Sequence, residues 1–155
     1  MHQAVPILVV AGLELWLASV LPWWAGWLVA WIGLSSLTAG VAYLANRPAM
    51  LGKRNALLRL WMAPYLRFSR IVASTAQRIG HKERDEVAPG IWVGGWPRRG
   101  APGLAQLDLT AELPRRGTAL AYANVPMLDG RGMADQAFAE AMSITRGWRA
   151  AGHPV

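Results

Sequence analysis

Apolar residues dominate the first part of the chain. Residues 5–45 contain a single ionisable side chain, Glu14. A bilayer core of about 30 Å takes about 20 apolar residues of helix, so this segment is long enough for two spans and too long for one. Proline removes a hydrogen bond from a helix interior, which makes Pro22 the favourable place for the chain to reverse direction. The pattern therefore predicts a hairpin of two transmembrane helices over residues 4–21 and 23–45.

Two features inside this segment concern the contact between the predicted helices. A carboxylate at the depth of Glu14 is costly in lipid, so it is expected to face protein, either as a proton or ligand site or as a helix contact; the helix contact is favoured because there is no second intramembrane charge. Small residues at near-helical spacing predict a close approach of the second helix to the first. They are Gly33, Ser36 and Gly40.

Residues 57–73 form a second kind of apolar segment, with basic residues on one side. Three arginines fall within about 80° on a helical wheel, and Pro64 predicts a kink. They are Arg59, Arg67 and Arg70. A third span would bury all three, at about 2.5–3.5 kcal/mol each. We therefore favour an interfacial helix, in which the arginines reach anionic lipid headgroups while Trp61 enters the acyl boundary.

The charge distribution supports a membrane anchor. The net charge is +7 over 155 residues, and up to Gly80 seven Lys and Arg stand against one acid. This asymmetry indicates anionic lipid rather than nucleic acid as the partner. Basic residues after position 46 predict that both ends of the hairpin are cytoplasmic, with the turn outside. We thus expect a multi-pass protein of the inner (cytoplasmic) membrane whose soluble domain is cytoplasmic.

The remainder has the pattern of a soluble α/β domain. Residues 81–86 are a charged linker, and residues 98–102 a loop. Three short strands are predicted at 91–93, 107–110 and 119–125, the last of them ended by Pro126. A helix follows over 133–151, and another strand opens at 153–155. This order predicts a mostly parallel sheet. The predicted domains are two transmembrane helices (1–46), a basic interfacial helix with a linker (47–84), and an incomplete α/β domain (85–155).

Four stretches of this domain, in order, resemble the dual-specificity branch of the cysteine-dependent protein tyrosine phosphatases, and bacterial membrane-anchored members in particular. They are VAPGIWVG at 87–94, LDLTAE at 107–112, YANVPMLDG at 122–130 and GHPV at 152–155. The resemblance implies hydrolysis of a phosphomonoester through a cysteinyl-phosphate, without metal or cofactor. It also implies that Asp129, in the P-x-L-D loop, is the general acid. A phosphoprotein or a phosphorylated lipid headgroup is the implied substrate.

One departure from the family pattern is decisive for activity. The His-Cys-x5-Arg loop, which supplies the nucleophile, is absent, and the chain contains no Cys. We expect the chain to be an N-terminal fragment of such a phosphatase, inactive by itself. The alternative is a non-enzymatic membrane adaptor with a degenerate phosphatase-like domain. Asp108 and Glu112 are interpreted as strand-end and loop residues rather than as a catalytic carboxylate pair.

Overall fold

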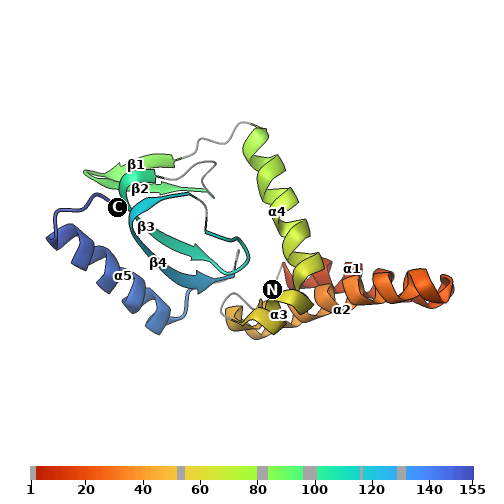
Figure 1. The fold of residues 1–155 in the computed structure, drawn as a ribbon. Helices are drawn as coiled ribbons and strands as arrows, with labels where there is room; N and C mark the ends of the chain where they lie inside the picture. The colour runs from red at the N-terminus through yellow and green to blue at the C-terminus, as the bar shows by residue number, and fades with distance from the viewer. Residues whose placement is uncertain (1–2, 52–54, 80–83, 96–100, 116, 129–131) are drawn as a thin grey trace. The chain divides into compact units, whose positions relative to one another are not determined.

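The computed structural model describes residues 3–51, 55–79, 84–95, 101–115, 117–128 and 132–155. The chain forms two compact units. The first contains residues 1–69 and 127–132, and the second contains residues 70–126 and 133–155. The first unit is helical, and the second contains the strands and a C-terminal helix (Figure 1).

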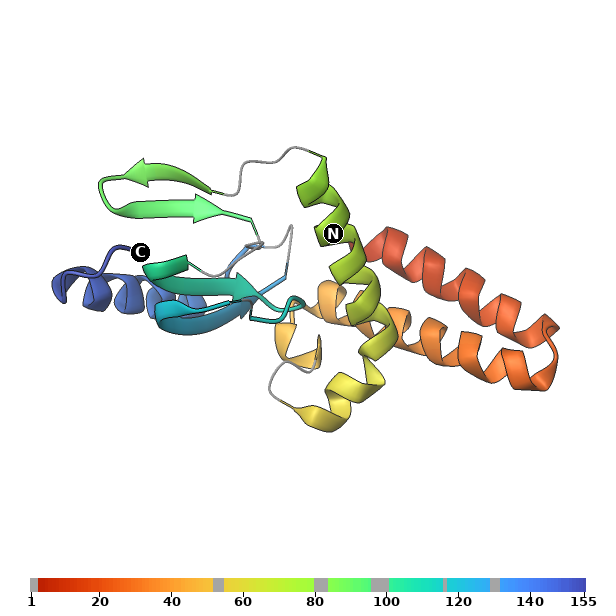
Figure 2. The ribbon, with the colours of Figure 1, turned by 45° about the horizontal axis from the view of Figure 1, so that its top comes forward.

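The predicted helical hairpin is present in the first unit. Helix α1 spans Ala4–Val20 and α2 spans Trp23–Ala45, so both lie within one residue of their predicted bounds. Pro22 caps the start of α2, and its carbonyl accepts hydrogen bonds from the backbone N–H groups of Ala25 and Gly26. Proline fits this place because its missing N–H is not needed at the start of a helix. The two helices lie side by side in antiparallel fashion (Figure 2).

Glycines on α2 bring the two helices together. A Cβ atom added at Gly26 would lie 2.8 Å from the Ala18 carbonyl oxygen, and one at Gly40 would lie 2.5 Å from Leu8 Cδ2. Gly33 is equally close to α1, because its added Cβ would lie 2.9 Å from Leu15 Cγ. These three glycines recur every seven residues. This repeat keeps one face of a helix toward its partner when the two helices form a left-handed supercoil. The close approach predicted at Gly33 and Gly40 is confirmed, and Gly26 extends this glycine seam.

The chain reverses direction again after α2. Asn46 ends α2 in the left-handed conformation, and a short 3-10 helix, η1, follows at Pro48–Leu51. The single kinked helix predicted over 57–73 is wrong: there are two helices, α3 at Ala56–Trp61 and α4 at Ala63–Arg78. The break comes just before Pro64, which thereby sits in the first turn of α4, where a proline is tolerated.

The second unit begins with a β-hairpin. Strand β1 spans Arg84–Ala88 and pairs in antiparallel fashion with β2, Ile91–Gly94. The prediction of a linker through residue 86 is therefore wrong from Arg84 onward, because this charged stretch pairs along the edge of β2. All five residues of β1 are exposed, and charged side chains are common on such edge strands.

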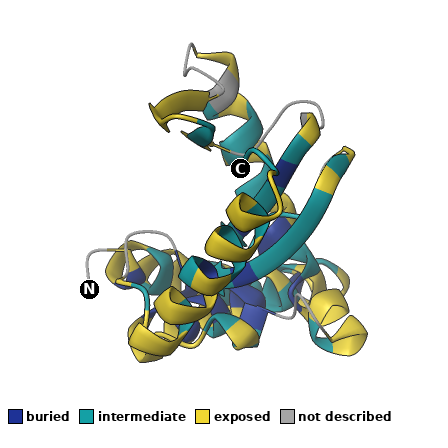
Figure 3. Cartoon of the chain, turned by 90° about the vertical axis from the view of Figure 1, so that its left-hand side faces the viewer, coloured by how far each residue is buried: buried dark blue, intermediate teal, exposed yellow. Residues whose placement is uncertain are grey.

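Two longer strands follow, and both run through a proline. Strand β3 spans Ala101–Thr110 and β4 spans Ala119–Met127; the two are paired and run in the same direction (Figure 1). The predicted loop through residue 102 is wrong at its end, since Ala101 and Pro102 belong to β3, and Pro126 does not stop β4. Helix α5, Asp135–Ala150, packs against β3 and turns an exposed face outward (Figure 3).

The C-terminal residues join the two strand pairs. The backbone N–H of Val155 donates to the Gly90 carbonyl at 3.0 Å, and the Val155 carbonyl accepts from the Trp92 N–H at 2.8 Å. Bonds to residues on either side of Ile91 are the pattern of parallel pairing. On the other side, the Ala105 N–H donates to the Pro154 carbonyl at 2.7 Å. The coarse prediction of an apolar helical segment followed by an α/β sheet with parallel strands is thus confirmed.

Candidate functional site

The turn between β1 and β2 fixes the place where the C-terminal segment enters the sheet. Gly90 has a positive φ of 73°, and its N–H donates to Glu86 Oε1 at 2.9 Å. Arg149, in the last turn of α5, donates from Nη1 to the Pro89 carbonyl at 2.7 Å. The positive φ favours glycine at position 90, and a Cβ there would also displace the Arg149 guanidinium, whose Nη1 would lie 2.5 Å away. The turn, α5 and Val155 therefore form one connected cluster.

Asp108 is the centre of a buried polar network near the end of β3. Its Oδ1 accepts hydrogen bonds from the Thr110 N–H at 2.8 Å and from the Thr110 hydroxyl at 2.7 Å. Its Oδ2 accepts from the Tyr122 hydroxyl of β4 at 2.6 Å. The Asn124 amide, also on β4, donates to the Asp108 carbonyl at 2.7 Å. Asp108 thus ties β3 to β4 through side chains as well as backbone, in agreement with its interpretation as a structural residue.

Tyr122 is held in its neutral form by this network. Burial, followed by the hydrogen bond to Asp108 and the negative charge of Asp108, raises the pKa of Tyr122 well above its usual range. The Arg115 guanidinium acts in the opposite direction, with its Cζ 4.4 Å from the centre of the tyrosine ring. The Tyr122 hydroxyl is therefore protonated at neutral pH and donates its hydrogen bond to Asp108.

The expected catalytic acid, Asp129, lies outside the described residues, as do Arg98 and Arg99. Strand β4, which precedes Asp129, ends at Met127, and the next residue, Leu128, is buried. His153 follows α5, and its N–H donates to the Trp148 carbonyl at 2.9 Å. No group of three His, Asp or Glu side chains close enough to hold a metal ion occurs in the part of the chain that the structure describes.

The expected membrane-interface residues are distributed over two helices. Arg59 lies on α3, whereas Arg67 and Arg70 lie on α4, so a single continuous wheel does not relate the three arginines. The indole of Trp61 donates from Nε1 to Thr38 Oγ1 of α2 at 3.2 Å. The backbone carbonyl of Trp61 accepts a hydrogen bond from Trp31 Nε1, also of α2, at 2.9 Å. Trp61 is therefore fastened to the helical hairpin.

Helix α4 remains strongly amphipathic without α3. Three large apolar side chains at helical spacing are exposed on it: Phe68, Ile71 and Val72. No acidic residue occurs between positions 63 and 78. An exposed apolar stripe beside arginines, with no compensating acid, is the composition of a helix that lies at a membrane surface.

Helix α2 is long and apolar enough to cross a membrane, and α1 is a shorter apolar helix of 17 residues. Large apolar side chains are exposed on both, and Trp23, Trp24 and Trp27 are exposed at the turn. Glu14 lies on α1 opposite Gly33, with its Cβ 3.2 Å from a Cβ added there, and its Oε2 is buried with no hydrogen-bond partner in the described part of the chain. It thus faces α2, as expected.

Comparison with protein-family models, with curated proteins and with solved structures finds no match to this chain.

Sequence reasoning missed several residues that hold these sites together. Arg149 was seen only as a helical residue, and Tyr122 and Asn124 only as part of a strand. Trp31 was counted only as an apolar residue, although a tryptophan inside a span carries an N–H that must find an acceptor. That requirement was the signal available in the sequence, and the acceptor that the Trp31 N–H finds is the Trp61 carbonyl.

Proposed function

We propose that this chain is the membrane-anchoring and N-terminal part of a cysteine-dependent phosphatase of the dual-specificity branch. The complete protein hydrolyses a phosphomonoester of a phosphoprotein or of a lipid headgroup. It is held in the inner membrane by two spans, α1 and α2, with its catalytic domain in the cytoplasm.

The position of Pro154 and Val155 is the observation that carries this proposal. In the family that the chain resembles, the strand before the nucleophile loop lies centrally in the sheet. Here Val155 pairs with β2 and Pro154 with β3, while β2 and β3 belong to separate strand pairs. Beyond these contacts β2 continues to Gly94 and β3 to Thr110. A strand that continues from Val155 therefore has partners on both sides.

The direction of such a strand also supports the proposal. Val155 is parallel to β2, and β3 and β4 run the same way as β2 (Figure 2). Ligands of parallel α/β sheets bind beyond the carboxyl ends of the strands. A loop that follows the central strand would emerge at that edge. There a thiolate attacks phosphorus, and Asp129 protonates the leaving oxygen, in the roles that the resemblance gives them.

The helical unit supports the membrane half of the proposal. Large apolar side chains on the outward faces of the hairpin are not covered by the other described residues. Lipid acyl chains cover them in this proposal. Arg67 and Arg70 of α4 contact anionic headgroups in this arrangement, and the long side chain of Arg59 on α3 extends to the same headgroups.

Extension of the chain tests the proposal. The coding DNA after the Val155 codon is read in all frames for a segment containing His-Cys-x5-Arg, and the chain extended by that segment is purified. We expect hydrolysis of p-nitrophenyl phosphate and a cooperative thermal transition. Asp129→Asn should then slow phosphoesters with poor leaving groups most, because they depend on protonation of the leaving oxygen. A downstream sequence without such a segment would favour the adaptor instead.

A further inference from the structure

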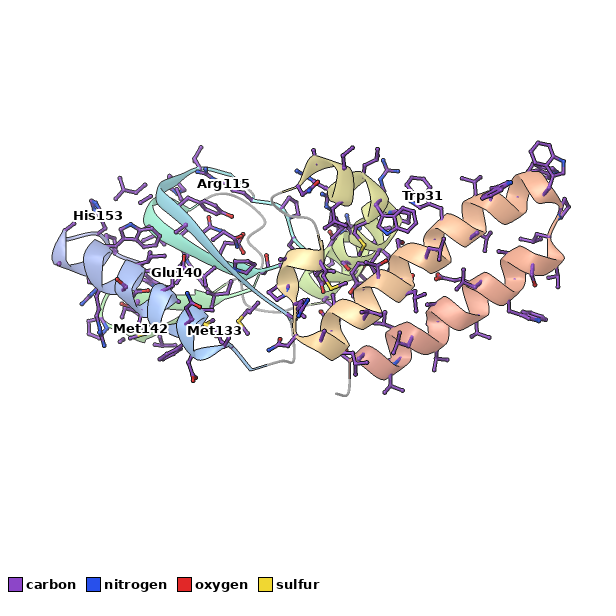
Figure 4. The ribbon with its side chains drawn as sticks, turned by 90° about the horizontal axis from the view of Figure 1, so that it is seen from below. Trp31, Arg115, Met133, Glu140, Met142 and His153 are labelled. Carbon is purple, nitrogen blue, oxygen red and sulfur yellow. The ribbon has the colours of Figure 1, made fainter. Side chains whose placement is uncertain are left out.

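The chain after α2 does not move away from the helical hairpin but turns back along it. Helix α3 is six residues long and ends at Trp61, whose side chain and carbonyl are both bonded to α2. Trp31 projects from α2 on the side away from α1 (Figure 4). The contact therefore lies on the outer side of the hairpin, on a face that α1 leaves free.

The positions of the bonded residues set the depth of this contact. Thr38 comes seven residues before the end of α2, which is about 10 Å along the helix axis, and Trp31 comes about 21 Å before that end. Arg47 and the basic residues after it mark the headgroup level beyond α2. When α2 spans the bilayer, Trp61 is therefore well inside the hydrocarbon region of the cytoplasmic leaflet.

The polar groups at this contact are satisfied as a buried lipid environment requires. The carbonyl at a helix C-terminus lacks an intrahelical partner, and for Trp61 the Trp31 indole N–H supplies one. The indole N–H of Trp61 donates to Thr38 Oγ1, and the Thr38 hydroxyl donates to the Leu34 carbonyl at 2.8 Å. Non-helical backbone occurs at membrane depth only where protein groups satisfy it in this way.

The apolar surfaces around the contact agree with the same environment. Leu51 and Met62, on either side of α3, are completely buried. Leu57 and Leu60 of α3 are 80% and 64% exposed, more than Val41 and Leu44 on α2. Arg59 is the one charged residue of α3, and its long side chain can extend to the headgroups while its stem stays in the apolar region.

We propose that α3 and the first turn of α4 form a re-entrant elbow that enters the cytoplasmic leaflet beside α2. Its hydrogen bonds face α2, and Leu57 and Leu60 contact lipid acyl chains. This inference rests on the proposed anchoring of α2 in a membrane. It differs from the interfacial helix expected from the sequence, because only α4 beyond the elbow then lies at the surface.

The absence of cysteine from the chain allows a direct test by single-cysteine spin labelling of the whole protein. Labels at Leu34, Leu37, Val41 and Leu44 of α2 provide a depth scale in vesicles of phosphatidylethanolamine and phosphatidylglycerol. A label at Val87, exposed on β1, provides the aqueous reference. Relative accessibility to oxygen and to a water-soluble nickel complex reports the depth of each label.

We expect the label at Leu60→Cys to fall within the scale set by Leu37→Cys and Leu44→Cys. A label at headgroup or aqueous depth, with the α2 labels still embedded, would overturn the elbow and leave the anchor intact. Aqueous accessibility along α2 itself would overturn the anchor, and the elbow with it. The two failures are therefore distinguishable.

Variants of α2 test whether the named hydrogen bonds hold the elbow in place. In Trp31→Phe combined with Thr38→Val, both contacts to Trp61 are lost, and the Leu60→Cys label should shift toward the headgroup level. Trp27→Phe, an exposed tryptophan on the same helix, is the matched control and should leave the label in place. An unchanged label in the double variant would contradict the assigned role of these bonds.

Discussion

The helical unit and the sheet unit achieve close packing by opposite means. In the helical unit, α2 approaches α1 because side chains are missing, at Gly26, Gly33 and Gly40. In the sheet unit, β3 and β4 are joined by added polar groups, with Asp108 accepting from Thr110 and Tyr122. In lipid the hydrophobic effect does not drive helices together, so close packing has to stabilise their association. In a domain surrounded by water, a buried polar network can hold elements together when all of its groups are hydrogen-bonded.

The difference also appears in how each unit is assembled along the chain. The helical hairpin joins neighbouring segments through one short turn. The centre of the sheet joins residues about 50 to 65 positions apart, since Pro154 meets Ala105 and Val155 meets Gly90 and Trp92. Pairing between residues far apart in the sequence closes long loops, and the entropy of loop closure is lost before the favourable contacts form. The sheet unit should therefore be the slower of the two to fold.

The largest effect is expected from Asp108→Ala in the sheet unit. The substitution removes the carboxylate that accepts from the Thr110 N–H, the Thr110 hydroxyl and the Tyr122 hydroxyl, and these half-buried donors lose that acceptor. The free energy of unfolding of this unit should fall by about 3 kcal/mol. Hydrogen exchange of the β3 and β4 amides measures it, with Glu140→Gln on the exposed face of α5 as the control. Equal protection in both variants would show that the network does not hold the strands together.

Gly40→Leu should produce the next largest effect, in the helical unit. An added side chain meets Leu8, so α1 and α2 must separate, at a cost of about 2 kcal/mol. Gly12→Leu is the matched control, because nothing lies within 4 Å of a Cβ added there. Unfolding in mixed detergent micelles compares the two variants. An equal change in the free energy of unfolding of both variants would show that the close approach at Gly40 does not contribute to stability.

Alkaline pH should distinguish the two units. The folded-state pKa of Tyr122 lies above its unfolded value of about 10, so above pH 10 the unfolded state releases a proton that the folded state retains. The stability of the sheet unit is therefore unaffected by this group below pH 10 and declines as the pH rises further. Tyr122→Phe should flatten the decline in urea unfolding between pH 9 and 11. An unchanged slope would assign it to other groups.

The effect per residue is smallest at the lipid surface. A peptide covering residues 63–79 should partition more strongly into anionic than into neutral vesicles, with Arg67 and Arg70 each contributing about 1 kcal/mol near the surface. Replacing both by Gln should remove most of the preference, and high salt should do the same. Equal partition into both kinds of vesicle would show that the apolar stripe of Phe68, Ile71 and Val72 binds without help from charge.

The two units also differ in how far their sequences predict them. The bounds of α1 and α2 follow from local apolar runs and from Pro22, which act within one segment. Strand β1 was missed because its charged residues carry no burial pattern, and only its pairing with β2 makes it a strand. Pro102 was predicted to lie in a loop and Pro126 to end a strand, although a proline is tolerated where a ladder does not need its N–H.

The candidate site was predictable only where it depends on order along the chain. The strand opening at residue 153 was expected, and Pro154 and Val155 do pair with β2 and β3. Arg149 and Trp31 were not foreseen as contact residues, because their partners, the Pro89 and Trp61 carbonyls, are backbone atoms of distant segments. Such partners leave no pattern in a sequence.

Phosphatase activity of the purified 155-residue chain tests the central claim most directly. The account predicts no hydrolysis of p-nitrophenyl phosphate above the background without protein, because the chain contains no thiolate nucleophile and no loop to stabilise the phosphoryl oxygens. Asp129→Asn should be indistinguishable from the unaltered chain. Turnover that survives removal of contaminating phosphatases and is lost in Asp129→Asn would contradict the account, because it would require a mechanism without cysteine.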